Sequence, residues 1–312
     1  MTRDNLSYIF FGTGHIARYV LDELEHAGLL PALVVSAPDA KRGRGMELSP
    51  SLVGAWALER SIETLKPENI GPSAIEDIRT RAKELGADVF VVVDYGYILP
   101  PELLAIPSRG ILNMHPSLLP RLRGPSPIRS AILNDEREVG VSIIRIDEKM
   151  DHGPIVAQKK VAVPEWPAST PNRGEPPRAD ALEELLAREG GRLLAQMLPL
   201  WLSGQIEERE QNHDVATYCT KFTKEDGMLD LSADPLPTGR QAYQNLLKIR
   251  AFEGWPGTFA FFERGGKRIR VQILDARLEG ENLVIESVKP EGKARMPYAD
   301  FLRSGAKPVV LQ

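Results

Sequence analysis

The sequence has almost no cysteine and no long apolar run. Cys219 is the only cysteine among 312 residues, which excludes an intramolecular disulfide framework and a cluster of thiolate metal ligands. No apolar stretch approaches the roughly 20 residues needed to cross a bilayer. The polar segment Met1–Ser7 lacks the basic and apolar regions of a signal peptide. These absences favour a cytoplasmic protein with no membrane partner.

The chain also lacks a strong excess of one charge. Its formal net charge is −4, from 39 Lys and Arg against 43 Asp and Glu, which argues against indiscriminate binding to nucleic acids. From His213 onward 15 Lys and Arg face 13 Asp and Glu, so this part permits a polyanionic partner without requiring one. Hydrophobic residues at 42% and charged residues at 26% are ordinary for a folded protein. The length is sufficient for two domains.

The first half of the sequence alternates short apolar runs with helical patterns. Leu6–Phe11 predicts a buried strand, Gly12–Gly14 a turn, and Ile16–Ala27 a helix. Further strands and helices are expected at Ala32–Ser36, Leu52–Arg60, Asp88–Val93, Pro101–Ile106 and Gly110–Met114. Continuous apolar strands between helices predict an α/β, Rossmann-like domain whose parallel-rich sheet is covered on both faces. Catalytic groups of such sheets gather at the carboxyl ends of the strands.

The second half changes character after a long helix. Val141–Ile146 and Ile155–Val163 are expected as strands, and Ala179–Leu202 as an amphipathic helix. Short alternating segments follow at Thr258–Phe262, Arg268–Leu274 and Leu283–Ser287, a pattern typical of a small β-barrel. We therefore expect two domains, 1–205 and 206–312, of which the second is a small β-barrel resembling an OB fold.

The turn Gly12-Thr13-Gly14 partly imitates a dinucleotide-binding motif, in which glycines let a pyrophosphate approach a helix N-terminus. Asp39, the nearest acidic residue after the second expected strand, lies in a loop that contains Pro and Gly. A ribose-binding acid is expected at the strand end instead. The pattern therefore favours a glycine turn of the kind that many α/β sheets share over a nicotinamide- or flavin-dependent oxidoreductase.

The segment from Asn113 to Ala131 is more informative. Asn113 and His115 lie two residues apart at the end of an apolar strand, so both side chains point to one face in extended geometry. A reaction that passes through a tetrahedral intermediate needs a donor that stabilises the oxyanion and a group that handles protons. Asn113 suits the first task and His115 the second. Alone, an Asn-x-His pair is more often a structural strand end.

Two motifs together resemble the signature of the 10-formyltetrahydrofolate-dependent transferases. The first runs from Asn113 to Pro120 and continues with Arg123-Gly124, and the second is Met150-Asp151-His152-Gly153-Pro154. The resemblance implies 10-formyltetrahydrofolate as co-substrate. No metal is implied, since the five histidines show no ligand spacing. It also implies a catalytic trio of Asn113, His115 and Asp151, and a folate site lined by Ser117, Leu118, Leu119 and Pro120.

In that family pattern Asp151 would stand beside His115. A carboxylate next to an imidazole favours its cationic form and fixes its orientation, so Asp151 would keep His115 ready to relay a proton. The structural alternative for Asp151 is a surface loop carboxylate. His152 stands where the family usually has a small hydroxyl residue, and we expect it to be a loop residue and not a fourth catalytic group.

Other segments indicate the formyl acceptor. Residues 38–45, Pro-Asp-Ala-Lys-Arg-Gly-Arg-Gly, resemble the loop that methionyl-tRNA formyltransferases insert after the second strand. Arg and Lys on a Gly-rich loop match phosphate oxygens and groove edges. The resemblance therefore implies tRNA contacts from Lys41, Arg42 and Arg44, although such a loop could also be merely solvated. The expected acceptor is the α-amino group of methionyl-tRNA. We expect the protein to be a monomer, and we expect its second domain to contact the tRNA as well.

Two other functions remain open at this stage. A sugar-nucleotide N-formyltransferase would share the trio but typically lacks the loop at residues 38–50. A tRNA-binding module with a decayed enzyme core would belong to a different class, and the intact trio speaks against it. A formyl-transfer assay with each acceptor distinguishes these functions.

Overall fold

The computed structural model describes residues 6–42, 46–166, 175–231 and 236–309. The chain forms two compact units. The first comprises 1–124, 139–161 and 183–218, and the second comprises 125–138, 162–182 and 219–312. Both units are thus built from separate stretches of the chain. The domain boundaries expected from the sequence, 1–205 and 206–312, remain a prediction.

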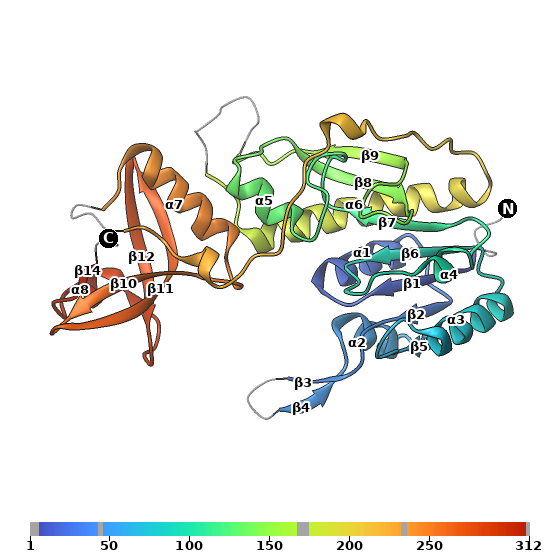
Figure 1. The fold of residues 1–312 in the computed structure, drawn as a ribbon, viewed down its shortest axis with the longest axis horizontal. Helices are drawn as coiled ribbons and strands as arrows, with labels where there is room; N and C mark the ends of the chain where they lie inside the picture. Colours follow the sequence, from blue (N-terminus) through green and yellow to red (C-terminus); the bar gives the residue numbers. More distant parts are fainter. Residues whose placement is uncertain (1–5, 43–45, 167–174, 232–235, 310–312) are drawn as a thin grey trace. The chain divides into compact units, whose positions relative to one another are not determined.

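A seven-stranded sheet forms the centre of the first unit (Figure 1), with the order β5-β2-β1-β6-β7-β8-β9. The strands in this order are Thr64–Leu65, Leu33–Val35, Tyr8–Gly12, Val89–Val93, Ile111–His115, Val139–Arg145 and Ile155–Val161. The first five run parallel, whereas β8 is antiparallel to β7 and β9 is antiparallel to β8. The expected parallel-rich α/β sheet is confirmed. Its order reverses at β1 and β6, where open α/β sheets bind ligands.

Helices cover both faces of this sheet. Ile78 of α3 (Pro72–Leu85) and Leu103 of α4 (Pro101–Leu104) share an apolar cluster with Ile111 of β7. Met114 has the opposite parity on β7 and therefore points to the other face. There Gly190 of α6 (Ala179–Leu202) approaches Met114 so closely that a Cβ would lie 2.6 Å from its sulfur. All residues of β1 and β6 are buried, as expected for strands covered on two faces.

Two more helices of the first unit, α1 and α2, pack beside those already described. α1 (His15–His26) follows the glycine turn after β1 and meets α6, because Gly191 packs against Val20. α2 (Leu52–Glu59) begins at Ser51, whose hydroxyl accepts a hydrogen bond from the Gly54 amide, the ordinary N-cap contact. No helix in the described part of the chain is long and apolar enough to cross a membrane.

Some elements differ from the sequence-based expectations. The polar segment after β2 contains a hairpin of β3 (Ala40–Arg42) and β4 (Glu47–Ser49), which extends away from the sheet in Figure 1. The helix α3 was not expected, because few of its side chains are buried and its apolar stripe is narrow. Its ends did carry a signal, since Pro72 begins it and Gly86 ends it with φ 61°, as helix-start prolines and helix-end glycines do.

A five-stranded antiparallel sheet forms the centre of the second unit, with the order β13-β12-β11-β10-β14. The strands are Met296–Pro297, Asn282–Pro290, Lys267–Glu279, Thr258–Arg264 and Lys307–Pro308. Alternate residues such as Ala260 and Phe262 join a core with Leu246 of α7 (Gly239–Ala251) and Phe301 of α8 (Tyr298–Leu302). The expected small β domain is confirmed as an antiparallel sheet. The helices α5 (Pro127–Leu133) and α7, which pack together here, were not expected.

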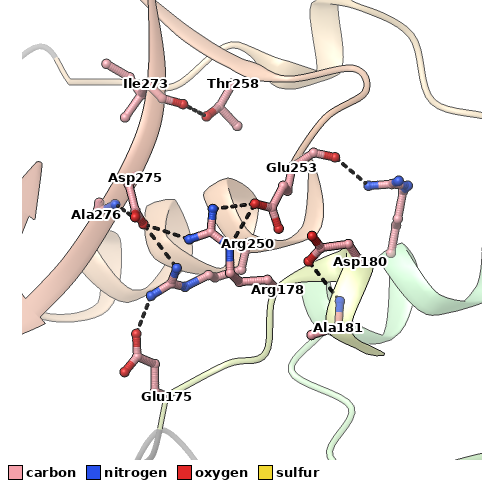
Figure 2. Close-up of polar contacts among 11 residues, drawn as sticks. Glu175, Arg178, Asp180, Ala181, Arg250, Glu253, Thr258, Ile273, Asp275 and Ala276 are labelled. Carbon is pink, nitrogen blue, oxygen red and sulfur yellow. Dashed lines mark hydrogen bonds and ion pairs between the residues drawn. The ribbon is translucent and has the colours of Figure 1, made fainter. Parts of the chain in front are cut away.

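Charged side chains from three stretches of the second unit meet in one cluster (Figure 2). Arg178 donates to Asp275 at 3.0 Å and pairs with Glu253. Arg250, a buried residue of α7, donates to the same Asp275 at 3.1 Å and pairs with Glu175. Asp275 therefore bridges an arginine that precedes α6 and an arginine of α7. The cluster ties the stretch 162–182 to the C-terminal part of this unit.

Candidate active site

The strand β7 positions the first two predicted catalytic residues. Asn113 is registered with Val92 of β6 and Ile144 of β8, so it lies in the middle of the sheet. His115 is the last residue of the strand and only 5% exposed. Since they are two residues apart, their side chains share one face. Asn113 is half-buried, and its carboxamide has no hydrogen-bond partner among the described residues, so it is available to a ligand.

The loop between β8 and β9 brings the third predicted residue to His115. Asp151 Oδ1 lies 3.6 Å from His115 Nδ1, and Asp151 Oδ2 accepts a hydrogen bond of 2.7 Å from the Gly124 amide. Asp151 adopts a left-handed φ of 50°, a conformation that costs energy in a residue other than glycine. Gly153 is required two positions later, because a Cβ there would lie 1.9 Å from the Arg145 carbonyl oxygen. Asp151 is therefore not a surface loop carboxylate without contacts, because it faces His115 and accepts from Gly124.

The other ring nitrogen of His115 fixes the imidazole within the protein. His115 Nε2 lies 2.9 Å from the carbonyl oxygen of Leu122. Because a carbonyl oxygen can only accept, Nε2 carries a proton. Nδ1 is the ring nitrogen that faces the carboxylate of Asp151. The contact of Nε2 with Leu122 therefore fixes which nitrogen of the ring is turned toward the carboxylate.

The segment predicted to bind folate follows His115 directly. The Ser117 hydroxyl donates to the Arg121 carbonyl at 2.6 Å, and Leu119 is buried against Ile144 and Ile155. These two side chains are turned into the protein. Leu118 and Pro120 are half-buried and reach solvent, so they are the members of the segment whose side chains can contact a ligand. The Leu119–Pro120 peptide bond is cis.

A buried arginine and glutamine behind the trio are functional candidates that the sequence reasoning missed. Arg123 is 1% exposed, and it donates to the Gln211 carboxamide oxygen at 2.8 and 3.2 Å. It also donates to the Tyr218 hydroxyl at 3.2 Å and to His213 Nδ1 at 2.8 Å. Nothing in the local sequence distinguishes a buried arginine from an exposed one, because its partners lie about 90 positions away. His152, expected as a loop residue, contacts this network because its ring stacks on the ring of His213.

Asp94, at the carboxyl end of β6, is a second residue that the sequence reasoning missed. Its side chain fills the space beside Gly14, where a Cβ would lie 2.0 Å from the carboxylate. Its φ is 47°. Asp94 is an exposed residue by its accessible surface, but the protein packed around its carboxylate reduces the hydration of that group, and Glu183 adds negative charge nearby; together they raise the pKa of Asp94 to about 6. The signal in the sequence was an acidic residue directly after a buried strand.

Two of the three residues predicted to contact tRNA, Lys41 and Arg42, lie on β3. Lys41 is exposed, its backbone is registered with that of Leu48 on β4, and the backbone of Arg42 is registered with that of Glu47. Arg44 falls outside the described residues. In the sequence the hairpin, residues 40–49, precedes the first residue of the proposed trio, Asn113, by more than 60 positions. Among the described residues no cluster of three or more His, Cys, Asp or Glu could hold a metal ion.

Residues 5–173 match the family described as formyl transferase. A methionyl-tRNA formyltransferase of Chloroflexus aggregans is 38% identical over 264 residues, which cover 84% of this chain and 78% of that protein. A methionyl-tRNA formyltransferase of Myxococcus xanthus is 34% identical over 328 residues, which cover 97% of each chain. The second similarity therefore extends through both units.

A solved structure confirms the fold. HypX from Aquifex aeolicus, in complex with tetrahydrofolic acid, superposes with a TM-score of 0.60 at 15% identity, covering 96% of this chain and 47% of that chain. Such a low identity supports the architecture alone. The family match covers more than half of the 312 residues and includes all three residues of the trio. The chain belongs to the formyl transferase family and is a relative of the methionyl-tRNA formyltransferases.

Proposed function

We propose that this protein transfers the formyl group of 10-formyltetrahydrofolate to the α-amino group of methionyl-tRNA, which gives formylmethionyl-tRNA, the initiator of translation. The observation that carries the proposal is the pairing of His115 with Asp151 at 3.6 Å at the carboxyl end of β7, the strand that also holds Asn113. The relatives with 34–38% identity share the acceptor named in their own descriptions. The hairpin at β3 and β4 supports the same acceptor.

The reaction needs an oxyanion site and a path for two protons. The amine nitrogen attacks the formyl carbon, and the carbonyl oxygen becomes an oxyanion in a tetrahedral intermediate. The carboxamide of Asn113, which has no partner among the described residues, and a cationic His115 stabilise that oxyanion. The bond between the formyl carbon and folate N10 then breaks, N10 gains a proton, and the attacking nitrogen loses one. Asp151 orients His115 and assists proton removal through water.

The folate co-substrate would lie against the segment that follows His115. We assign its contacts to Ser117, Leu118, Leu119 and Pro120, of which Leu118 and Pro120 offer side chains, whereas Ser117 and Leu119 hold the segment in place. The segment is well anchored, because the Ser142 hydroxyl donates to the Ser117 carbonyl at 2.7 Å and accepts from the Leu119 amide at 3.1 Å. A rigid wall lowers the entropy that folate binding must overcome.

The tRNA would contact cationic groups on both proposed domains. In the first domain we assign these contacts to Lys41 and Arg42 of β3 and to Arg44, which follows them in the sequence. In the proposed second domain, 206–312, Phe259 and Phe261 alternate with the core residues Ala260 and Phe262 and lie on the opposite face of the sheet. Phe259 is only 6% exposed there, and Phe261 is half-buried. Arg270 and Arg268 lie over their rings, each with its guanidinium carbon 3.8 Å from the ring centroid. Stacked arginines of this kind offer flat cationic surfaces to phosphates and bases.

The test of this function is a direct comparison of acceptors. The purified protein is incubated with 10-formyltetrahydrofolate and either methionyl-tRNA or an amino-sugar nucleotide, and the formylated product is identified by mass. We expect formylmethionyl-tRNA and no formylated sugar. Formylation of the sugar nucleotide alone would replace the proposal with the sugar-nucleotide N-formyltransferase. Binding of tRNA without transfer to either acceptor would indicate a binding module.

A further inference from the structure

Gln211 uses its whole carboxamide to join the two loops that carry the site. The residue lies in the segment after α6, and it is 4% exposed. Its Oε1 accepts from Arg123 Nη2 at 2.8 Å and from Nε at 3.2 Å. Its Nε2 donates to the carbonyl oxygens of Asp151 at 2.9 Å and Gly153 at 2.7 Å. An arginine can only donate and a carbonyl oxygen can only accept, so the orientation of this amide is fixed.

These contacts lie directly behind the catalytic pair. Arg123 stands between Leu122, whose carbonyl accepts from His115, and Gly124, whose amide donates to the Asp151 carboxylate. On the other side, Gln211 donates to the backbone of Asp151 itself. The amide therefore sets the backbone on both sides of the 3.6 Å separation between His115 and Asp151.

The backbone at Asp151 is one that needs such support. Its φ of 50° is left-handed, and residues in that region persist only where their surroundings fix them. Gln211 supplies two of those constraints by its donated hydrogen bonds. A glutamate would keep the bonds from Arg123 but would place a carboxylate oxygen against two carbonyl oxygens. An asparagine is one methylene shorter and could not span Arg123 and the two carbonyls together.

We propose that Gln211 is a positioning residue for formyl transfer, which holds Asp151 at the distance from His115 that the reaction needs. The proposal rests on the proposed function for its kinetic test, and on geometry alone for its structural test. Gln211 touches no reacting atom in this role. A purely structural anchor would change the stability of the protein and leave the turnover of the folded enzyme intact.

The kinetic experiment compares Gln211→Glu with the wild type. Displacing a catalytic group by about 1 Å can cost about a hundredfold in rate, so we expect kcat to fall by about tenfold to a hundredfold. The KM values for 10-formyltetrahydrofolate and methionyl-tRNA should change by less than about threefold. The control is Gln205→Glu, an exposed glutamine of the same segment with the same change of charge, which should retain the wild-type kcat. Gln211→Asn serves as the second variant.

The structural experiment needs no substrate. Amide hydrogen exchange is measured at Gly124, whose N–H donates to Asp151 Oδ2, with the amides of β1 and β6 as the reference. In Gln211→Glu we expect exchange at Gly124 to become about tenfold faster while the sheet keeps its protection. Faster exchange throughout the first unit would mean that Gln211 is only a structural anchor, and it would overturn the proposal. Unchanged exchange at Gly124 would also overturn the proposal.

The two tests separate this proposal from the function itself. A wild type that formylates no methionyl-tRNA would overturn the function, and the exchange at Gly124 would still decide the role of Gln211. If either variant is too unstable to purify, the other carries both measurements. A Gln211→Glu enzyme with wild-type kcat would exclude the positioning role even if the function holds.

Discussion

The two units use their buried polar groups for different purposes. In the first unit, polar contacts hold an irregular backbone around the proposed active site, where Asp94, Leu122 and Asp151 have positive φ values of 47°, 56° and 50°. Each such residue costs about 1–3 kcal/mol. In the second unit, Arg178 and Arg250 share Asp275 and join separate stretches of the chain. The first set of contacts maintains the geometry of the proposed active site, and the second joins separate stretches of the second unit.

The largest expected effect is a loss of turnover on substitution of Asn113 or His115. We expect Asn113→Ala and His115→Ala each to lower kcat by roughly a hundredfold or more, since removing one oxyanion donor typically costs about 2.7–4 kcal/mol. The KM for 10-formyltetrahydrofolate should change little. Asn113→Ala should also leave the melting temperature unchanged, because no hydrogen bond of this carboxamide is present in the described structure. Steady-state kinetics and thermal unfolding measure the two quantities.

Near wild-type turnover in either variant would remove the trio assignment. It would also remove the contrast between the units, because the polar contacts around the trio would then have only a structural role, like those of the arginine cluster. The matched reference is the exposed Gln205→Glu variant, which shares neither strand nor loop with the trio.

The next effect concerns stability in the second unit. Asp275→Asn keeps the size of the side chain but leaves Arg178 and Arg250 without their shared carboxylate. Broken buried pairs cost about 3–5 kcal/mol and exposed ones about 0–1 kcal/mol. For this partly buried cluster we expect a loss of about 2 kcal/mol in the free energy of unfolding, measured by denaturant titration, with kcat retained.

The control for the cluster is Glu286→Gln in the same sheet. Glu286 pairs with Arg277 at 2.9 Å, and both side chains are 43% exposed, so the loss should stay below about 1 kcal/mol. Equal losses for Asp275→Asn and Glu286→Gln would show that the cluster is an ordinary surface network.

A smaller effect should come from the basic hairpin, and it tests the acceptor. We expect Arg42→Glu combined with Arg44→Glu to raise the KM for methionyl-tRNA by about tenfold. The salt dependence of tRNA binding should become shallower, because each phosphate contact contributes just under one unit to the log-log slope. The constant for folate should not change. Arg79→Glu with Lys83→Glu on α3 makes the same change of charge elsewhere, and an equal effect from that pair would contradict the hairpin assignment.

The smallest effect is a pH-dependent change in stability at Asp94. Because the pKa of Asp94 is raised to about 6 in the folded protein and is about 3.9 in an unfolded chain, the folded state binds its proton more tightly. The stability from this group is complete below about pH 4 and is lost as the pH rises through about 6. Asp94→Asn should therefore melt higher than the wild type at pH 7.5 and equally at pH 4. A variant that melts lower at pH 7.5 would show that the carboxylate is stabilising there.

The sequence could predict most of the central sheet, and it named the three residues of the proposed trio. Buried parallel strands are continuous apolar runs, so β1, β6 and β7 could be located within two residues. The helix α6 was placed at Ala179–Leu202, as observed, because its apolar stripe is long and ends at Ser203-Gly204. The period of two placed Asn113 and His115 on one face. The role of Asp151 came from a motif, since its contact with His115 spans 36 positions.

By itself the sequence determined what local chemistry encodes: strand and helix periods, the glycine that the loop at residue 153 requires, and the residue types at the end of β7. Only the tertiary structure decided which distant groups meet. It turned β8 and β9 antiparallel, brought α5 against α7, and buried Arg123 beside Gln211. A periodic pattern depends on neighbours a few positions apart, whereas a hydrogen bond between residues 88 positions apart depends on the path of the whole chain between them.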